Sequence, residues 1–150
     1  CPIDIGSNFD NCKTYFWKSL SAPKYLPKHK IRFSDNFLYG AYGGYSITYQ
    51  NIQFAAHLGL NPIYIIGCDH NYKGEDNSRK VGLIKNQVNN HFINNYRLPG
   101  EKVNAAPIEL MTIAHKHAKA YIDKTKNNII NATRGGSLDV YERVDFSKLF

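Results

Sequence analysis

Small and apolar residues recur at helical spacing after a glycine-rich turn, and a short apolar run follows them. Ser46 stands just before the periodic stretch and is a suitable helix N-cap. The Asn-Pro pair at 61–62 prevents the helix from continuing, because proline has no backbone N–H to donate. Residues 63–66 are continuously apolar, which predicts a strand buried on both faces of a sheet. The predicted helix face consists of Ile52, Ala55, Ala56 and Gly59.

A second unit repeats this order nearer the C-terminus. Residues 107–124 carry a helical apolar stripe that begins at a proline, a residue tolerated in a first helical turn. Residues 129–132 predict a second short strand, and the alternation in 138–144 predicts a further strand or sheet edge before a helical turn from Asp145. This order predicts an α/β fold in which strands 63–66 and 129–132 are parallel and adjacent or nearly so. Helix 107–124 is their expected crossover, with Met111, Ala114, Ala118 and Ile122 against the sheet.

The rest of the chain shows little periodicity. Residues 1–45 predict irregular structure with a short element around 15–20 and a strand near 30–33, and the stretch 39–46 predicts a glycine-rich turn. No internal repeat or domain boundary interrupts residues 1–150, so a single domain is expected. About forty polar, Asn-rich residues separate the first strand from the second helix, and a connection this long is either disordered or a functional lid.

Composition and charge narrow the class of protein. The formal net charge of +7 favours an anionic ligand such as one bearing phosphate, although a solvated basic surface explains it equally well. The basic residues are scattered, and no run resembles a nucleic-acid-binding tail. The three cysteines have no paired spacing, which fits a reducing cytoplasm. No stretch reaches the length of a membrane span and no secretory signal is present, so a cytoplasmic protein is expected.

Polar clusters follow both predicted strands. The first strand ends in GCDHNY (67–72) and the second in NATRGG (131–136). Ligands of open parallel sheets bind at the carboxyl ends of the strands. The two clusters are therefore expected in one crevice, which would hold Asp69, His70 and Tyr72 together with Thr133 and Gly135.

The residues of these clusters admit functional and structural interpretations. Asp69 and His70 offer a carboxylate and an imidazole for proton transfer or ligand binding. The structural alternative is that Asp69 caps a turn and His70 is a solvated loop residue. His91, in the long loop, is either a general base that closes over the crevice or an inert loop residue. No ligand spacing supports a metal site among the three.

The second cluster suits phosphate. Arg134 and backbone N–H groups freed by Gly135 and Gly136 are good phosphate-binding groups, but an exposed Arg at a strand-to-turn junction is the alternative. His115 and His117 lie two residues apart on the predicted helix, so their side chains point in different directions and both are interpreted as structural.

Three ordered blocks carry a resemblance to a known family. ITYQNIQFAAHLGLNPIYIIGCDHNY, NHFINNY and INATRGGSLDVYERVDFSKLF resemble the 6-hydroxymethylpterin diphosphokinase MptE-like family, which includes motility-associated-factor glycosyltransferases and is distantly similar to bacterial CMP-sugar sialyltransferases. The resemblance runs from about Phe33 to Phe150 and implies a Rossmann-like three-layer fold with a mostly parallel sheet. The positions that match the family's motifs are Gly67, Asp69, His70, Tyr72, His91, Phe92, Asn131, Thr133, Gly135 and Gly136.

The resemblance also implies a function. It favours a transferase that moves a sugar from a nucleotide-activated donor, preferably a CMP-sugar, to a glycan or protein hydroxyl in bacterial surface polysaccharide or glycoprotein biosynthesis. His70 or His91 would act as base, whereas Arg134, Tyr72 and backbone amides would hold the phosphate. The alternatives are a Mg²⁺-dependent diphosphotransferase acting on a pterin alcohol and a non-catalytic nucleotide-binding fragment. The family's N-terminal strand and GNGPS-type loop have no counterpart here, so the chain is expected to be the C-terminal portion of such a catalytic domain.

Overall fold

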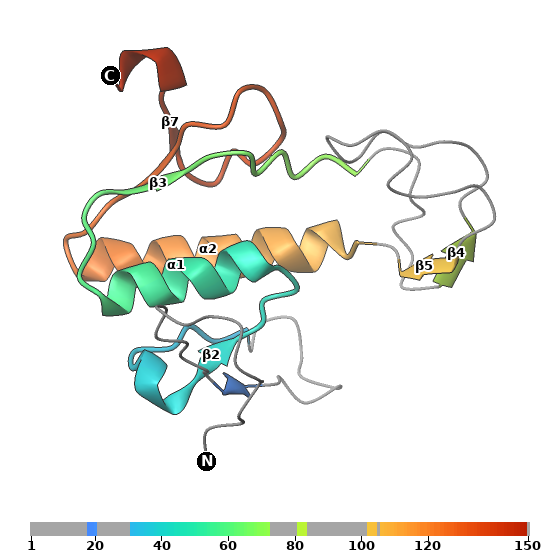
Figure 1. The fold of residues 1–150 in the computed structure, drawn as a ribbon, viewed down its shortest axis with the longest axis horizontal. Coiled ribbons are helices and arrows are strands. Elements are labelled where there is room, and N and C mark those ends of the chain that lie inside the picture. The colour runs from blue at the N-terminus through green and yellow to red at the C-terminus, as the bar shows by residue number, and fades with distance from the viewer. Residues whose placement is uncertain (1–17, 21–30, 73–80, 84–101, 105, 150) are drawn as a thin grey trace, which may run out of the picture.

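Helices and short strands combine in an α/β fold. The computed structural model describes residues 18–20, 31–72, 81–83, 102–104 and 106–149. Two helices, α1 (Ile47–His57) and α2 (Ile108–Lys124), lie side by side beneath a three-stranded parallel sheet (Figure 1). Within these ranges no helix has both the length and the apolar character needed to cross a membrane. The sheet has the order β3-β6-β7, formed by β3 (Ile63–Ile65), β6 (Ile129–Asn131) and β7 (Glu142–Arg143).

The central strand pair has the predicted direction and neighbours. Ile63 pairs with Ile129 and Ile65 with Asn131, and the two strands are parallel. Helix α2 lies between them in the chain and is the crossover that a parallel pair requires. The predicted adjacent parallel strands are thus confirmed. β7 adds a short parallel edge on the other side of β6, within the segment expected to form a further strand or edge.

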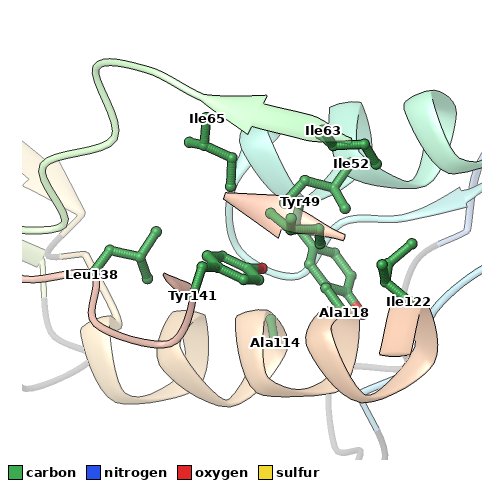
Figure 2. Packing of buried hydrophobic residues seen from close by; sticks show 10 residues of the cluster. Tyr49, Ile52, Ile63, Ile65, Ala114, Ala118, Ile122, Leu138 and Tyr141 are labelled. Atoms are coloured by element: carbon green, nitrogen blue, oxygen red, sulfur yellow. The ribbon is translucent and has the colours of Figure 1, made fainter. Parts of the chain in front are cut away.

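The core lies between this sheet and the two helices (Figure 2). Ala114, Ala118 and Ile122 of α2 are buried there, as predicted, whereas Met111 is buried outside this cluster. Alanines at one-turn spacing let the helix approach the strands closely, because they present no bulky side chain. The other buried members are Tyr49, Ile52, Ile63, Ile65, Ile129, Leu138 and Tyr141.

The predicted burial of the first strand on both faces is wrong. Ile63 and Ile65 point into the core, but Tyr64 is 44% exposed and Ile66, just beyond the strand, is 61% exposed. The physical reason is that both helices pack against the same face of the sheet. The described residues therefore supply two of the three layers that a Rossmann-like arrangement has.

Helix α1 begins where predicted, and Ile52, Ala55 and Ala56 of its predicted face pack in the core. The Ser46 hydroxyl accepts a hydrogen bond from the Thr48 N–H at 3.1 Å, which confirms the N-cap. Gly59 lies beyond the helix end and is exposed, whereas Gln53 is fully buried. The Gln53 amide donates to the Tyr42 carbonyl at 2.8 Å and accepts from the Tyr42 N–H at 3.0 Å. A side-chain amide thus satisfies backbone groups that a sheet would otherwise pair.

The expected strand near 30–33 is not formed in its described part, residues 31–33. The Arg32 carbonyl accepts from the Tyr49 hydroxyl at 2.8 Å, and the Ser34 N–H donates to Gln53 at 2.9 Å. Side chains of α1 therefore take the bonds that a neighbouring strand would take.

The smaller elements complete the description. The expected element around 15–20 lies partly outside the described residues, and its described part contains the short strand β1. At the other end of the chain, Asp145 caps a 3₁₀ turn, as predicted. These elements are β1 (Ser19–Leu20) parallel to β2 (Ala41–Tyr42), β4 (Val81–Leu83) antiparallel to β5 (Lys102–Asn104), and the 3₁₀ turns η2 (Phe37–Tyr39) and η3 (Phe146–Lys148).

Candidate functional site

The loops that follow β3 and β6 are joined by hydrogen bonds. The Cys68 N–H donates to the Thr133 hydroxyl at 3.1 Å, and the Ser137 N–H donates to the Asp69 carbonyl at 2.7 Å. Gly136, with φ of +79°, packs so closely that a Cβ atom there would lie 2.6 Å from the Asp69 carbonyl oxygen. The prediction that the two strand ends meet is confirmed.

The same edge of the fold receives the first turns of both helices (Figure 1). The Thr48 hydroxyl of α1 is hydrogen-bonded to the Cys68 thiol. Thr112 of α2 lies 2.8 Å from His70. Helix N-termini carry partial positive charge and unpaired N–H groups, so this edge is electrostatically suited to an anion.

His70 points into the protein rather than into the crevice. Its side chain is 8% exposed, and its backbone has the left-handed φ of +51°. The hydroxyl of Thr112 donates to the Ile108 carbonyl at 2.9 Å, so it must accept from His70 and His70 Nε2 carries the proton. The expectation that His70 faces a ligand is wrong, because the turn after Gly67 directs the imidazole onto α2.

A second histidine, His115, completes a buried pair that sequence reasoning missed. The two rings lie edge to face with their centroids 5.7 Å apart, and His115 is 0% exposed. The Tyr141 hydroxyl donates to the His115 carbonyl at 3.2 Å, so it accepts from His115 Nδ1 at 2.9 Å. His70 Nδ1 and His115 Nε2 are left as buried nitrogen atoms without a hydrogen-bond partner.

Burial keeps this pair uncharged. Desolvation lowers the pKa of His70, and desolvation together with the neighbouring His70 lowers the pKa of His115 to about 4. Burial likewise raises the pKa of the Cys68 thiol and of the Tyr141 hydroxyl. His115 was interpreted from the sequence as a structural residue of the helix, but no local signal indicated that it would meet His70.

Arg143 holds the loop after β6 from one side. Its guanidinium donates to the Thr133 carbonyl at 3.0 Å and also to the Gly135 carbonyl. In the part of the chain that the structure describes, the N–H groups of Arg134, Gly135 and Gly136 have no acceptor. Two carbonyls of the loop are therefore bonded, whereas these three amides find no acceptor among the described residues. Arg143 was not among the predicted site residues, because its role becomes apparent only from its position beside the loop.

Two other predicted binding residues have different surroundings from those expected. The Arg134 guanidinium lies over the Phe146 ring at 5.4 Å from its centroid, a cation–π contact at the C-terminal turn. Asn131 is buried, donates to the Leu138 carbonyl at 2.8 Å and accepts from the Thr133 N–H at 3.0 Å. It shapes the loop from within instead of facing a ligand, which corrects its predicted binding role.

The remaining candidates lie in the loop after β3 or outside the described residues. The Asp69 side chain is exposed beside the joined loops, Tyr72 is half-buried, and Gly67 turns with φ of +70°. His91 and Phe92 lie outside the described residues. Among the residues that are described, no three His, Cys, Asp or Glu side chains gather closely enough to hold a metal ion.

Comparison with known proteins adds no relative. No family model, curated protein or solved structure matches the chain. The resemblance seen in the sequence blocks therefore stays a prediction.

Proposed function

We propose that the chain binds the phosphate of a nucleotide-activated sugar at the joined strand-end loops and transfers that sugar to a glycan or protein hydroxyl. The donor that we favour is a CMP-sugar, and the compartment is the cytoplasm. The reaction would break the bond between the anomeric carbon and phosphate and form one to the acceptor oxygen. The bonding electrons leave with the phosphate, and the acceptor's proton passes to a base.

One observation carries the proposal. Among the described residues the amides of Arg134, Gly135 and Gly136 have no acceptor, while Arg143 bonds the Thr133 and Gly135 carbonyls of the same loop. Backbone N–H groups held in this way attract a phosphate oxygen without any side-chain reorganisation. The net charge of +7 and the two nearby helix N-termini favour the same anionic group.

The base for the acceptor is assigned to Asp69 in preference to His70. Asp69 is exposed beside the loop, whereas His70 is buried with its Nε2 proton bonded to Thr112. A general base must reach the hydroxyl from which it takes the proton. His91 keeps its predicted role as a second candidate on the long connection.

The binding step is tested by isothermal titration of the purified chain with CMP, UDP, GDP, ATP and a CMP-sugar, each with and without Mg²⁺. We expect CMP and the CMP-sugar to bind without a requirement for Mg²⁺. Binding of ATP alone, dependent on Mg²⁺, would instead favour the diphosphotransferase. Absence of binding by every nucleotide would reject the proposal and leave a non-catalytic module.

A matched pair of variants tests the role of the loop. Arg143→Lys keeps the charge but loses the planar fork that reaches two carbonyls at once, so we expect roughly tenfold weaker binding of CMP, or about 1.4 kcal/mol. Arg32→Lys makes the same chemical change at an exposed site away from the loop and should leave the affinity unchanged. Equal effects of the two variants would refute the positioning argument.

A further inference from the structure

We propose that His70 and His115 form an acid-sensitive latch, in which the neutral imidazole pair holds residues 67–72 against α2 and protonation releases that segment. The latch joins three parts of the fold. His70 belongs to the loop after β3, His115 to the middle of α2, and Tyr141 to the segment before β7. A change of charge within the pair therefore acts on the loop that is hydrogen-bonded to the loop after β6.

The hydrogen bonds of the pair leave no room for a second proton. His70 Nε2–H is bonded to Thr112, and His115 Nδ1–H is bonded to Tyr141. The remaining nitrogens, His70 Nδ1 and His115 Nε2, are buried without a partner. A proton added to either nitrogen would create a buried cation with no acceptor, and a second would face the first across rings 5.7 Å apart.

Among the described residues, no group that faces the pair carries a compensating charge. Those titratable side chains are Cys68 from the β3 loop, Tyr49 from α1 and Tyr141, and burial raises the pKa of all three, which keeps them neutral. Asp69, Glu109, Lys116 and Asp139 of the adjoining segments are exposed to solvent. The pair can therefore gain a proton favourably only by moving into water.

The segment that must move is the one bearing His70. It follows β3, its backbone is strained at His70 with φ of +51°, and His70 donates a hydrogen bond to Thr112 of α2. An open state that exposes both rings would titrate them near 6.5, whereas the closed state titrates His115 near 4. Between pH 7 and pH 5 this difference at His115 alone raises the opening equilibrium roughly twentyfold.

Cys68 reports on the opening, since it is half-buried in the segment beside His70. In a Cys1→Ser, Cys12→Ser background, its rate of reaction with 4,4′-dithiodipyridine is measured from pH 7.5 to 5. The rate of the urea-unfolded chain at each pH corrects for the intrinsic reactivity of the thiol. We expect the protection of Cys68 to fall roughly twentyfold from pH 7 to pH 5, while far-UV circular dichroism stays unchanged. Constant protection, or exposure that only accompanies global unfolding, would overturn the latch.

Variants separate this pair from other histidines. His70→Gln and His115→Asn keep a donor near the bonded nitrogen but cannot take a proton, so the double variant should retain its protection at pH 5. His117→Gln, two residues along α2, should behave as the parent does. Loss of protection in the double variant as pH falls would refute the assignment.

A measurement on the unsubstituted chain covers the case in which the double variant does not fold. Nuclear magnetic resonance titration of the His70 and His115 imidazoles should show pKa values below 6.5 for both, and ordinary values would overturn the latch. Any effect on nucleotide binding rests on the proposed function. The thiol assay needs no ligand, so the two proposals can fail separately.

Discussion

Replacing Tyr141 with phenylalanine removes one oxygen atom from the interior and leaves the ring in place. That oxygen accepts from His115 Nδ1 at 2.9 Å and donates to the His115 carbonyl at 3.2 Å. The substitution therefore leaves the buried Nδ1–H of His115 without a partner, whereas the His115 carbonyl lies within α2 and keeps its bond in the helix. One such unpaired group costs about 1–3 kcal/mol, so we expect the free energy of unfolding to fall by about 1–3 kcal/mol.

A change of tautomer cannot rescue the variant. If the proton of His115 moved from Nδ1 to Nε2, it would reach a nitrogen that is also buried without a partner. The loss should therefore approach the full cost of the unpaired donor and should not relax to a few tenths of a kcal/mol.

Urea denaturation followed by tryptophan fluorescence measures the change in unfolding free energy at constant m-value. Tyr64→Phe is the matched control, because Tyr64 is 44% exposed and its hydroxyl loses only contacts that water replaces. We expect this control to lie within about 0.5 kcal/mol of the parent. A Tyr141→Phe variant as stable as the Tyr64→Phe control would refute the hydrogen-bond assignment in the core.

Three further predictions concern the loops, the pH dependence and the helix cap. Gly136→Ala should cost about 2 kcal/mol or more, because its Cβ would meet the Asp69 carbonyl at 2.6 Å. Gly135→Ala, with a similar φ but open space, should cost about 1 kcal/mol in the same urea assay. Because the folded-state pKa of His115 is lowered from 6.5 to about 4, its contribution to stability should be lost as pH falls from about 6.5 to 4. The loss is about 3 kcal/mol and is measured by urea midpoints across that range. Ser46→Ala should lower the unfolding free energy by about 1 kcal/mol, and an unchanged midpoint would contradict the cap.

The elements that were predicted correctly are those with a local cause. The N-cap at Ser46, the helix at 108–124 and the parallel pair β3–β6 follow from side chains a few residues apart or from apolar runs. The meeting of the strand ends followed from the rule that parallel strands deliver their carboxyl ends to one edge. Thr133 and Asp69 were therefore placed together without any knowledge of the contacts between them.

The features that were missed depend on contacts between distant parts of the chain. His70 and His115 are far apart in sequence, and nothing in the run GCDHNY indicates that the imidazole turns inward. Residues 31–33 have a strand-like composition, but Tyr49 of α1 bonds the Arg32 carbonyl and Gln53 bonds the N–H of the adjoining Ser34. An apolar run also does not say how many faces of the sheet are covered, which is why the exposure of Tyr64 was not foreseen.

The pairing of β3 with β6 has a consequence for how the chain folds. Ile63 pairs with Ile129, so the contact closes a loop of 129 − 63 = 66 residues. Contacts of such high sequence separation cost chain entropy before they contribute stability, so sheets of this kind form slowly. On the ribosome, β3 cannot acquire its partner until β6 has left the exit tunnel. Until then the isoleucines of β3 and the apolar face of α1 lack their cover, and chaperone binding during synthesis should concentrate on residues 47–66.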